Sequence, residues 1–262
     1  MNEQAPMPKP APLPGVNHVL AVASGKGGVG KSTTAVNLAL AMSRAGLSIG
    51  LLDADIYGPN IPVMMGRKVQ PDMDETRGMI PVERLGVKFI SLGLIAGDGV
   101  PIVWRGPMLA KMLTQFLHDV AWAPLDCLVI DLPPGTGDVQ LTLTQSVAIS
   151  GAVIVTTPQE IALEDVRRGI RMFETVHVPV LGILENMSYY ICPKCDKKHA
   201  IFSEGGGRTM ADQFEVPFLG EVPLSTALRE ASDTGEPLVD PSHPVTKTYD
   251  EIAQTVIGHL RD

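Results

Sequence analysis

The chain has 262 residues, of which 45% are hydrophobic and 19% are charged, and its formal net charge is -8. This length and hydrophobic content are sufficient for one sizeable core. The acidic balance, without any cluster of five or more Lys and Arg residues, argues against nucleic acid as a main partner. No apolar stretch reaches the ~18 residues that a spanning helix needs, and the N-terminus lacks a signal-peptide pattern. We therefore expect no membrane partner and a cytoplasmic location.

The N-terminal segment is rich in proline, and a folded domain follows it. Prolines at alternate positions from 6 to 14 predict an extended tail over residues 1–16 that buries little. In the domain, residues 17–262, apolar β-type runs alternate with helical patterns, which predicts an α/β fold with a doubly wound, mostly parallel sheet. The stretch from Met64 to Val82 is too irregular to assign. The predicted strands are His18–Ala23, Ile49–Asp53, Val87–Leu92, Cys127–Leu132, Ala152–Thr156, Val180–Leu184 and Pro217–Glu221.

A glycine-rich loop that fits the pattern G-x-x-x-x-G-K-[ST] follows the first predicted strand. Its glycines allow successive backbone N–H groups to point at phosphates, and the helix predicted from Ser32 to Ala45 adds the partial positive charge of its N-terminus. By their places in the motif, Lys31 reaches the β- and γ-phosphates, Ser32 ligates Mg²⁺, and Thr33 lies near the α-phosphate. The sequence thus predicts a nucleoside triphosphate site made of Gly25, Lys26, Gly27, Gly28, Val29, Gly30, Lys31, Ser32 and Thr33.

Lys26 is a second lysine in a loop that needs only one. Because Lys31 already occupies the phosphates, we expect the Lys26 ammonium group to point outward, towards a partner chain. The pattern from Lys26 to Ser32 resembles the deviant Walker A (SIMIBI) group of NTPases. In that group two subunits close face to face, and this lysine crosses to the phosphates of the other subunit. The resemblance implies a homodimer and a catalytic role for Lys26, whereas a solvated surface lysine is the alternative.

Two acidic residues end the second predicted strand and precede a sharp turn at Gly58-Pro59. We expect Asp55 to orient the water molecule that attacks the γ-phosphate, and Asp53 to organise Mg²⁺ and its waters. The alternative for both residues is that they only cap the turn.

The predicted strand that contains Cys127 also ends in an acid, Asp131, as is usual for a carboxylate that holds Mg²⁺ through water. The following loop, residues 133–138, is too rich in proline and glycine for a helix. We interpret it as a second switch, in which the Gly135 N–H group contacts the γ-phosphate.

Asn186 follows another strand at the same carboxyl edge of the sheet. Its amide is suited to pairing with the edge of adenine, although an ordinary turn-forming asparagine is an open alternative. In the deviant Walker A group an asparagine at this place contacts adenine, so the resemblance implies ATP and not GTP.

Cys192 and Cys195 form a C-x-x-C pair in a loop that spans residues 188–204, whereas Cys127 is expected to be an inert core residue. So few cysteines fit a reducing compartment. Two thiolates cannot complete a four-sulfur site, but a twofold dimer brings four of them to one axis, where they can hold a [4Fe–4S] cluster. Zinc with His199 as a third ligand, and a redox-active dithiol, are the alternatives.

Several motifs in the same order resemble the Mrp/ApbC family of ATP-dependent iron–sulfur cluster carriers over Val16 to about Asp240. They are D-A-D-I-Y-G-P-N at residues 53–60, V-W-R-G-P-M at 103–108, I-D-L-P-P-G-T-G-D at 130–138, and the segment 185–190 followed by the C-x-x-C pair. Two departures are Asn60, where serine is common, and the Pro-rich tail in place of a small N-terminal domain of many relatives.

The resemblance implies an ATPase that binds a [4Fe–4S] cluster at a homodimer interface and transfers it to apoproteins, with slow ATP hydrolysis. Its partners would be apo iron–sulfur clients and cluster-assembly scaffolds. The main rival is a partition or septum-site ATPase, a spatial regulator of the same superfamily. Against it, the helical C-terminal stretch Pro244–Asp262 is acidic, so we expect it to dock on its own domain. An electron donor of the nitrogenase type would have widely separated cysteines.

Overall fold

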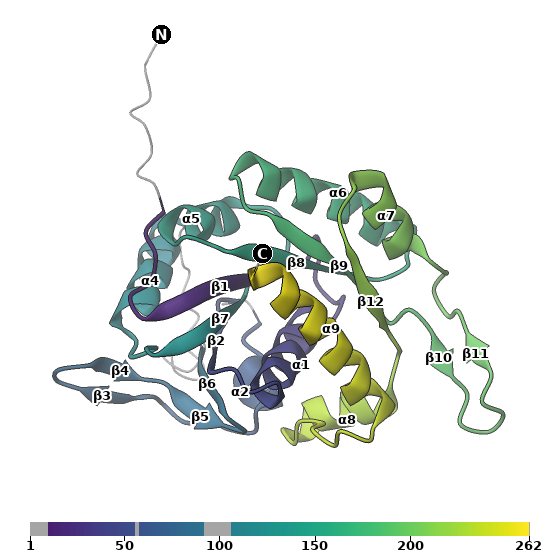
Figure 1. The fold of residues 1–262 in the computed structure, drawn as a ribbon, viewed down its shortest axis with the longest axis horizontal. Helices are drawn as coiled ribbons and strands as arrows, with labels where there is room; N and C mark the ends of the chain where they lie inside the picture. The colour runs from purple at the N-terminus through teal and green to yellow at the C-terminus, as the bar shows by residue number, and fades with distance from the viewer. Residues whose placement is uncertain (1–9, 56–57, 92–105, 262) are drawn as a thin grey trace, which may run out of the picture.

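A computed structural model describes residues 10–55, 58–91 and 106–261 of the chain (Figure 1). The strands are β1 Val16–Ala23, β2 Ile49–Asp53, β3 Asp72–Asp74, β4 Gly78–Ile80, β5 Val82–Arg84, β6 Val87–Ser91, β7 Leu125–Asp131, β8 Gly151–Thr156, β9 Val180–Asn186, β10 Tyr190–Ile191, β11 Lys198–His199 and β12 Phe218–Val222. The helices are α1 Lys31–Arg44, α2 Ile61–Met64, α4 Gly106–Asp119, α5 Asp138–Ser146, α6 Glu160–Thr175, α7 Gly206–Phe214, α8 Thr226–Thr234 and α9 Pro244–Arg261.

The centre of the fold is a sheet with the strand order β12-β9-β8-β1-β7-β2-β6-β5. Neighbouring strands are parallel except at one edge, where β5 pairs with β6 in the antiparallel sense. This confirms the predicted doubly wound, mostly parallel sheet. The carboxyl ends of β1, β2, β7 and β9 therefore meet at one edge, and the loops that follow them form the site described below.

Helices cover both faces of the sheet, so the central strands are buried on both sides (Figure 1). In β1, Val19 and Ala21 contribute to a hydrophobic cluster that includes residues of α4, α5, α6 and α7. Leu20 and Val22 contribute to a second cluster that includes residues of α1, α2, α8 and α9. Because side chains alternate across a strand, this near-continuous apolar run fills both cores.

The predicted strands agree with the observed ones to within two residues where the structure describes them; Leu92 and residues 103–105 lie outside the described residues. The unassigned stretch from Met64 to Val82 contains a small hairpin of β3 and β4. Each of these strands has only three residues, which is too short for a period-2 pattern to be recognised.

Part of the predicted tail is folded onto the domain. Leu13 is buried, and its carbonyl group accepts a hydrogen bond from the Val16 N–H group at 3.2 Å. The Ala148 N–H group donates to the Ala11 carbonyl at 3.0 Å. The other described residues of the segment, 10–12, 14 and 15, are exposed, so it buries little apart from the one leucine that anchors it. Residues 1–9 lie outside the described residues.

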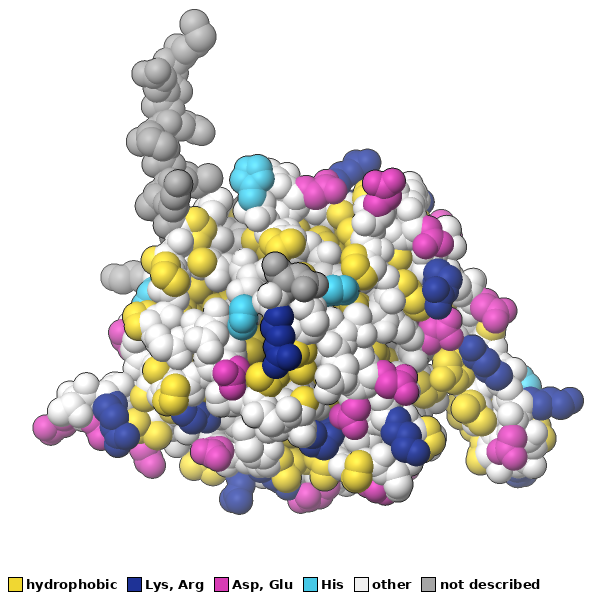
Figure 2. All heavy atoms as spheres, viewed as in Figure 1, with side chains coloured by type: hydrophobic (Ala, Val, Ile, Leu, Met, Phe, Trp, Pro, Cys, Tyr) yellow, Lys and Arg dark blue, Asp and Glu magenta, His cyan; other side chains and the backbone are white. Residues whose placement is uncertain are grey.

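The C-terminal helix α9 docks on its own domain, as predicted. Tyr249, Ile252 and Val256 are buried among residues of α1 and the sheet, and Arg44 of α1 forms an ion pair of 2.6 Å with Asp250. No helix in the described part of the chain has the length and apolar character needed to cross a membrane. On the face seen in Figure 2, acidic and basic side chains are interspersed.

Candidate nucleotide-binding site and cysteine hairpin

The P-loop connects the carboxyl end of β1 to α1. Gly28 and Gly30 have φ angles of 80° and 82°, in the left-handed region that favours glycine. Gly25 is required for another reason, because a Cβ atom there would lie 2.1 Å from Cβ of Asp165 in α6. A Cβ atom at Gly27 or Gly28 would meet open space. The loop thus presents a backbone cradle at the N-terminus of a 14-residue helix, as anion binding requires.

Lys31, predicted to bind the β- and γ-phosphates, is buried against two carboxylates in this structure. Its Nζ atom lies 2.7 Å from Asp131 Oδ1 and 3.4 Å from Asp55 Oδ2. It also lies 3.4 Å from the Ser32 hydroxyl oxygen. Two buried carboxylates at the ends of β7 and β2 attract the ammonium group strongly. The contact of Lys31 with the β- and γ-phosphates stays a prediction.

Two carboxylate oxygens of this cluster have no hydrogen-bond partner within the described part of the chain. They are Asp55 Oδ1 and Asp131 Oδ2, and both are buried. Burial raises the pKa of Asp131 above its usual value, and the nearby Lys31 ammonium group offsets part of this rise. Buried acceptors without partners are costly. Beside the Ser32 hydroxyl they form a set of oxygen ligands of the kind that Mg²⁺ prefers.

Asp53 is fully engaged by protein donors. Its carboxylate accepts hydrogen bonds from the Ser91 hydroxyl at 2.9 Å, from the Asp55 N–H group at 3.2 Å and from the Ile61 N–H group at 3.3 Å. Burial, reinforced by the charge of Asp131, raises the pKa of Asp53 to about 8. This geometry favours the alternative in which Asp53 caps the turn before α2 over a role in organising Mg²⁺.

The loop after β7 contacts the P-loop directly. The Gly135 N–H group donates a hydrogen bond of 2.9 Å to the Ser24 carbonyl oxygen. The Gln140 side chain donates to the carbonyl groups of Pro133 at 2.8 Å and Pro134 at 3.2 Å. A contact between this N–H group and the γ-phosphate would require the bond to Ser24 to break, and it stays a prediction.

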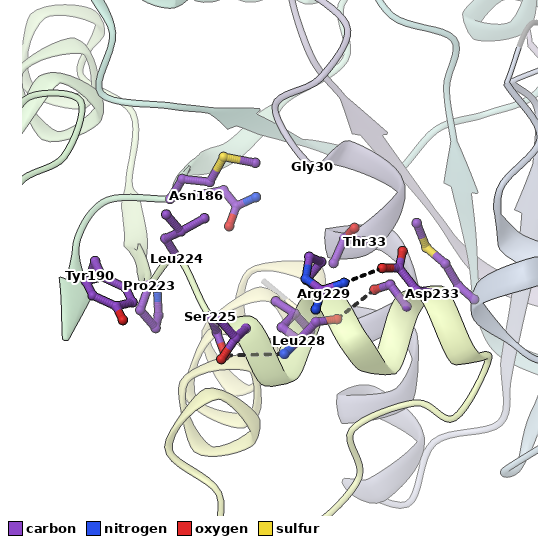
Figure 3. Close-up of a pocket in the computed structure, with 14 residues that line it drawn as sticks. Gly30, Thr33, Asn186, Tyr190, Pro223, Leu224, Ser225, Leu228, Arg229 and Asp233 are labelled. Atoms are coloured by element: carbon purple, nitrogen blue, oxygen red, sulfur yellow. Dashed lines mark hydrogen bonds and ion pairs between the residues drawn. The ribbon is translucent and has the colours of Figure 1, made fainter. Parts of the chain in front are cut away.

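A cavity of about 450 Å³ adjoins the end of the P-loop (Figure 3). Gly30 and Thr33 lie at one end of it, and Asn186 and Tyr190 come from the end of β9 and from the segment that follows. The Asn186 amide lines the cavity and donates a hydrogen bond of 2.9 Å to the Val29 carbonyl. The prediction that this amide contacts a base is compatible with its place, although one of its N–H groups is used by the P-loop.

Helix α8 forms another wall of this cavity and was not expected from the sequence. Ser225 caps the helix by accepting a hydrogen bond of 3.3 Å from the Leu228 N–H group. Arg229 forms an ion pair of 2.7 Å with Asp233 along the same helix (Figure 3). No motif marks these residues, and only the parallel pairing of β12 with β9 brings α8 to the P-loop.

Lys26, predicted to point outward to a partner chain, contacts a residue of its own chain in this structure. Its Nζ atom donates a hydrogen bond of 3.3 Å to Gln159 Oε1, just before α6. The side chain is half-buried. Its role across a dimer stays a prediction.

Cys192 and Cys195 lie in the turn of a hairpin formed by β10 and β11. Cys192 is half-buried and Cys195 is exposed. Hydrogen bonds from the backbone of Lys194, from the Cys195 side chain and from the Cys195 backbone lower the pKa of Cys192. Cys127 is buried in β7, and burial raises its pKa to about 12, which confirms the expectation of an inert core thiol.

His199 pairs with Tyr190 on the opposite strand of the same hairpin. Among the residues that the structure describes, no group of three or more His, Cys, Asp and Glu side chains is placed to share a metal ion. In the described part of one chain, the two thiols and His199 therefore do not form such a group, and zinc with His199 as a ligand stays an alternative.

Comparisons with known proteins identify close relatives. A family model described as NUBPL iron-transfer P-loop NTPase, of ParA type, matches residues 15–257. A mitochondrial protein of Arabidopsis thaliana, named as an iron-sulfur protein required for NADH dehydrogenase, is 49% identical over 253 residues, which are 95% of this chain and 81% of that protein. An iron-sulfur cluster carrier protein of Aquifex aeolicus is 49% identical over 258 residues, which are 97% of this chain and 71% of that protein.

One of the similar solved structures is a nucleotide-binding protein of Archaeoglobus fulgidus in complex with ADP. It is 39% identical, with a TM-score of 0.79, and the match covers 90% of this chain and 92% of that one. A protein of similar fold is thus known in complex with ADP.

Proposed function

Because the chain belongs to the NUBPL iron-transfer family of ParA-type P-loop NTPases, we propose that it carries a [4Fe–4S] cluster and transfers it to apoproteins under the control of ATP. The cluster is the cargo, and the clients are apo iron–sulfur proteins that receive it from this carrier. Cluster-assembly scaffolds are the proposed source.

The observation that carries this proposal is the placement of the two thiols. Cys192 and Cys195 lie at the tip of a hairpin that leaves the sheet beside the P-loop, and Cys195 is exposed. The lowered pKa of Cys192 favours the thiolate form that ligates iron. An accessible pair of thiols on a projecting hairpin suits a cluster that must be accepted and released.

A homodimer supplies the remaining ligands in this proposal. One chain offers two thiols at the hairpin, and a [4Fe–4S] cluster takes four cysteine thiolates. A twofold axis through the hairpins brings Cys192 and Cys195 of each chain together. The resemblance of the P-loop to the deviant Walker A group supports the same arrangement, because in that group the lysine at the place of Lys26 crosses to the phosphates of the other subunit.

The nucleotide site supports binding and hydrolysis of ATP with Mg²⁺. The backbone of the P-loop holds the phosphates, Lys31 supplies a point charge, and Asn186 and the cavity beside it accept the base. Ser32, Asp131 and Asp55 are the residues that would hold Mg²⁺ and its waters, and Asp55 also orients the attacking water. The bound ion would neutralise charge that develops on the phosphates. Hydrolysis is expected to be slow and coupled to cluster carriage.

The test is anoxic reconstitution of the purified protein with iron and sulfide, followed by visible absorption and iron analysis. We expect the native protein to acquire the thiolate-to-iron absorption band, and Cys192→Ala and Cys195→Ala to lose it while they still bind ATP. Equal cluster content in the native protein and in both variants would refute the iron–sulfur proposal.

The rival function, a partition or septum-site regulator, has less support. Such a protein needs a surface element that seeks membrane or DNA. The apolar side of α9, including Val245 and Ile257, is buried against the domain, and Asp250 on this helix is paired with Arg44. The paired cysteines would also have no role in that function.

A further inference from the structure

A buried carboxylate, Glu185, closes the base of the loop that carries the two cysteines. Its Oε1 atom accepts a hydrogen bond of 2.5 Å from the Ser188 hydroxyl, where the loop begins. Its Oε2 atom accepts a hydrogen bond of 2.5 Å from the Gly207 N–H group, where the loop ends and α7 begins. Glu185 is completely buried. One carboxylate therefore holds both ends of the segment that contains Cys192 and Cys195.

The Gly207 contact depends on a close approach of backbone and side chain. A Cβ atom at Gly207 would lie 3.0 Å from both Cβ and Oε2 of Glu185. Gly207 is also in the first turn of α7, where the helix dipole favours a negative charge. A buried carboxylate is costly unless it is hydrogen-bonded, so the two bonds hold the side chain in one position.

The neighbouring residue, Asn186, contacts the P-loop. Its amide donates to the Val29 carbonyl at 2.9 Å. A Cβ atom at Gly30 would lie only 2.1 Å from Asn186 Nδ2, so the amide packs directly against the loop backbone. Both residues belong to the last part of β9, where pairing with β12 fixes the backbone of Glu185 opposite Glu221 and of Asn186 opposite Val222.

The next residues run from this junction into the hairpin along the cavity. Met187 and Tyr190 line the cavity beside the P-loop (Figure 3), and Tyr190 is paired in the hairpin with His199. The Ser188 N–H group donates to the Val222 carbonyl at 3.0 Å, and the Leu224 N–H group donates to the Tyr189 carbonyl at 2.7 Å. The segment 185–190 thus contacts the P-loop, the cavity and the cysteine hairpin.

We propose that the segment 185–190 transmits occupancy of the nucleotide site to Cys192 and Cys195 within one chain, and that Glu185 is the positioning residue that makes this transmission possible. The inference rests on the proposed function for its biological meaning. A ligand that fills the cavity contacts Tyr190 and Met187 and either moves these side chains or holds them in one position. Because Glu185 keeps both ends of the loop in place, a change at these two residues alters the positions of the thiols instead of only shifting the base of the loop.

The experiment measures the rate at which iodoacetamide alkylates each cysteine of the cluster-free protein, with and without Mg²⁺ and ATP, by mass spectrometry under anoxic reducing conditions. Cys127 is buried, so its alkylation reports unfolding and serves as an internal standard. We expect ATP to change the rates at Cys192 and Cys195 by roughly fivefold or more in the native protein, and to have no effect on these rates in Glu185→Ala. The affinity for ATP, measured by calorimetry, should remain close to that of the native protein in this variant.

Three further variants separate positioning from general damage. Glu185→Gln should restore the ATP effect, because its amide oxygen can accept from Gly207 and its NH₂ group can donate to the Ser188 hydroxyl oxygen. Ser188→Ala removes one of the two bonds and should weaken the ATP effect. This variant replaces Glu185→Ala as the test if alkylation of Cys127 shows that Glu185→Ala is unfolded. Ser48→Ala breaks a hydrogen bond of 2.7 Å to Asp126 in β7 and should leave the effect intact.

The proposal is overturned if folded Glu185→Ala and Ser188→Ala keep the full ATP effect, or if ATP binds the native protein without changing either rate. Iron loading, measured on separate samples, distinguishes this result from a failure of the proposed function. If the protein loads a cluster but ATP does not change the alkylation rates, only the proposal of transmission through Glu185 is refuted. If ATP changes the rates but the protein never loads iron, the transmission is supported and the carrier function is refuted.

Discussion

The ammonium group of Lys31 lies 2.7 Å from the carboxylate of Asp131, and both side chains are buried. The pair joins the P-loop to the end of β7, and Asp55 at 3.4 Å extends it to the end of β2. A nucleotide that recruits Lys31 must draw it from these carboxylates, and Mg²⁺ would replace the lost positive charge beside them. Nucleotide and metal ion are therefore expected to bind together.

Lys31→Ala should weaken ATP binding about 10- to 100-fold, because a charge-assisted contact to the phosphates is lost. The same change leaves two buried carboxylates without a cation, which should lower the free energy of unfolding of the nucleotide-free protein by about 3 kcal/mol. Calorimetric titration and urea unfolding measure the two effects. Lys68→Ala, at an exposed position, is the control. Native affinity in Lys31→Ala would exclude the predicted phosphate contact.

Lys26→Ala should bind ATP normally but hydrolyse it at least about tenfold more slowly, because a charge supplied across the dimer would be missing in the transition state. Phosphate release at several protein concentrations measures the rate. Gln159→Ala removes the 3.3 Å contact within the chain and should keep the native rate. If Lys26→Ala hydrolyses ATP as fast as the native protein does, the crossing role is wrong.

Asp53 should make the nucleotide-free protein less stable as the pH rises. Burial raises the pKa of Asp53 from 3.8 to about 8, so between these values the folded state keeps a proton that the unfolded state has lost. The contribution of Asp53 to the free energy of unfolding is therefore fully present below about pH 4. It falls between about pH 4 and pH 8, by at most about 1.4 kcal/mol per pH unit. Asp53→Asn cannot ionise and should reduce the slope.

Urea unfolding between pH 5 and 8.5 measures this dependence for the native protein and the variant. Asp233→Asn, which changes an exposed carboxylate, controls for the loss of one negative charge. Identical slopes for the native protein and Asp53→Asn would contradict a protonated Asp53 in the folded state.

The sequence predicted the fold and the P-loop well because both depend on local patterns. Val19 to Ala23 form a continuous apolar run before a glycine-rich loop, and this combination specifies a buried parallel strand followed by a phosphate site. The walls of the cavity could not be predicted in the same way. Arg229 and Asp233 reach the P-loop only through the order of strands in the sheet, which no local pattern contains.

The positions of single side chains were also beyond the sequence. The structure pairs Lys31 with Asp131 and the Gly135 N–H group with Ser24, and the motif predicts neither of these contacts within the chain. Both groups are strong donors, and each finds the acceptor that the fold places nearest to it. One hydrogen bond of Asp53 comes in the same way from Ser91, which lies on a strand far along the chain.

The metal content of the purified protein distinguishes the two ways in which the cysteine hairpin can bind a metal. A [4Fe–4S] cluster takes four thiolates, and each chain offers Cys192 and Cys195, so the reconstituted protein should contain about four irons per two chains and elute as a dimer. A zinc site that used His199 would hold about one metal ion per chain. Size-exclusion chromatography with light scattering, and iron and zinc analysis of the same peak, measure this ratio.

His199→Ala should retain the full iron content, because the described structure gives His199 no place beside the two thiols. A monomer that holds one zinc ion per chain, loses it in His199→Ala and accepts no iron would refute the carrier function and establish a zinc hairpin in its place.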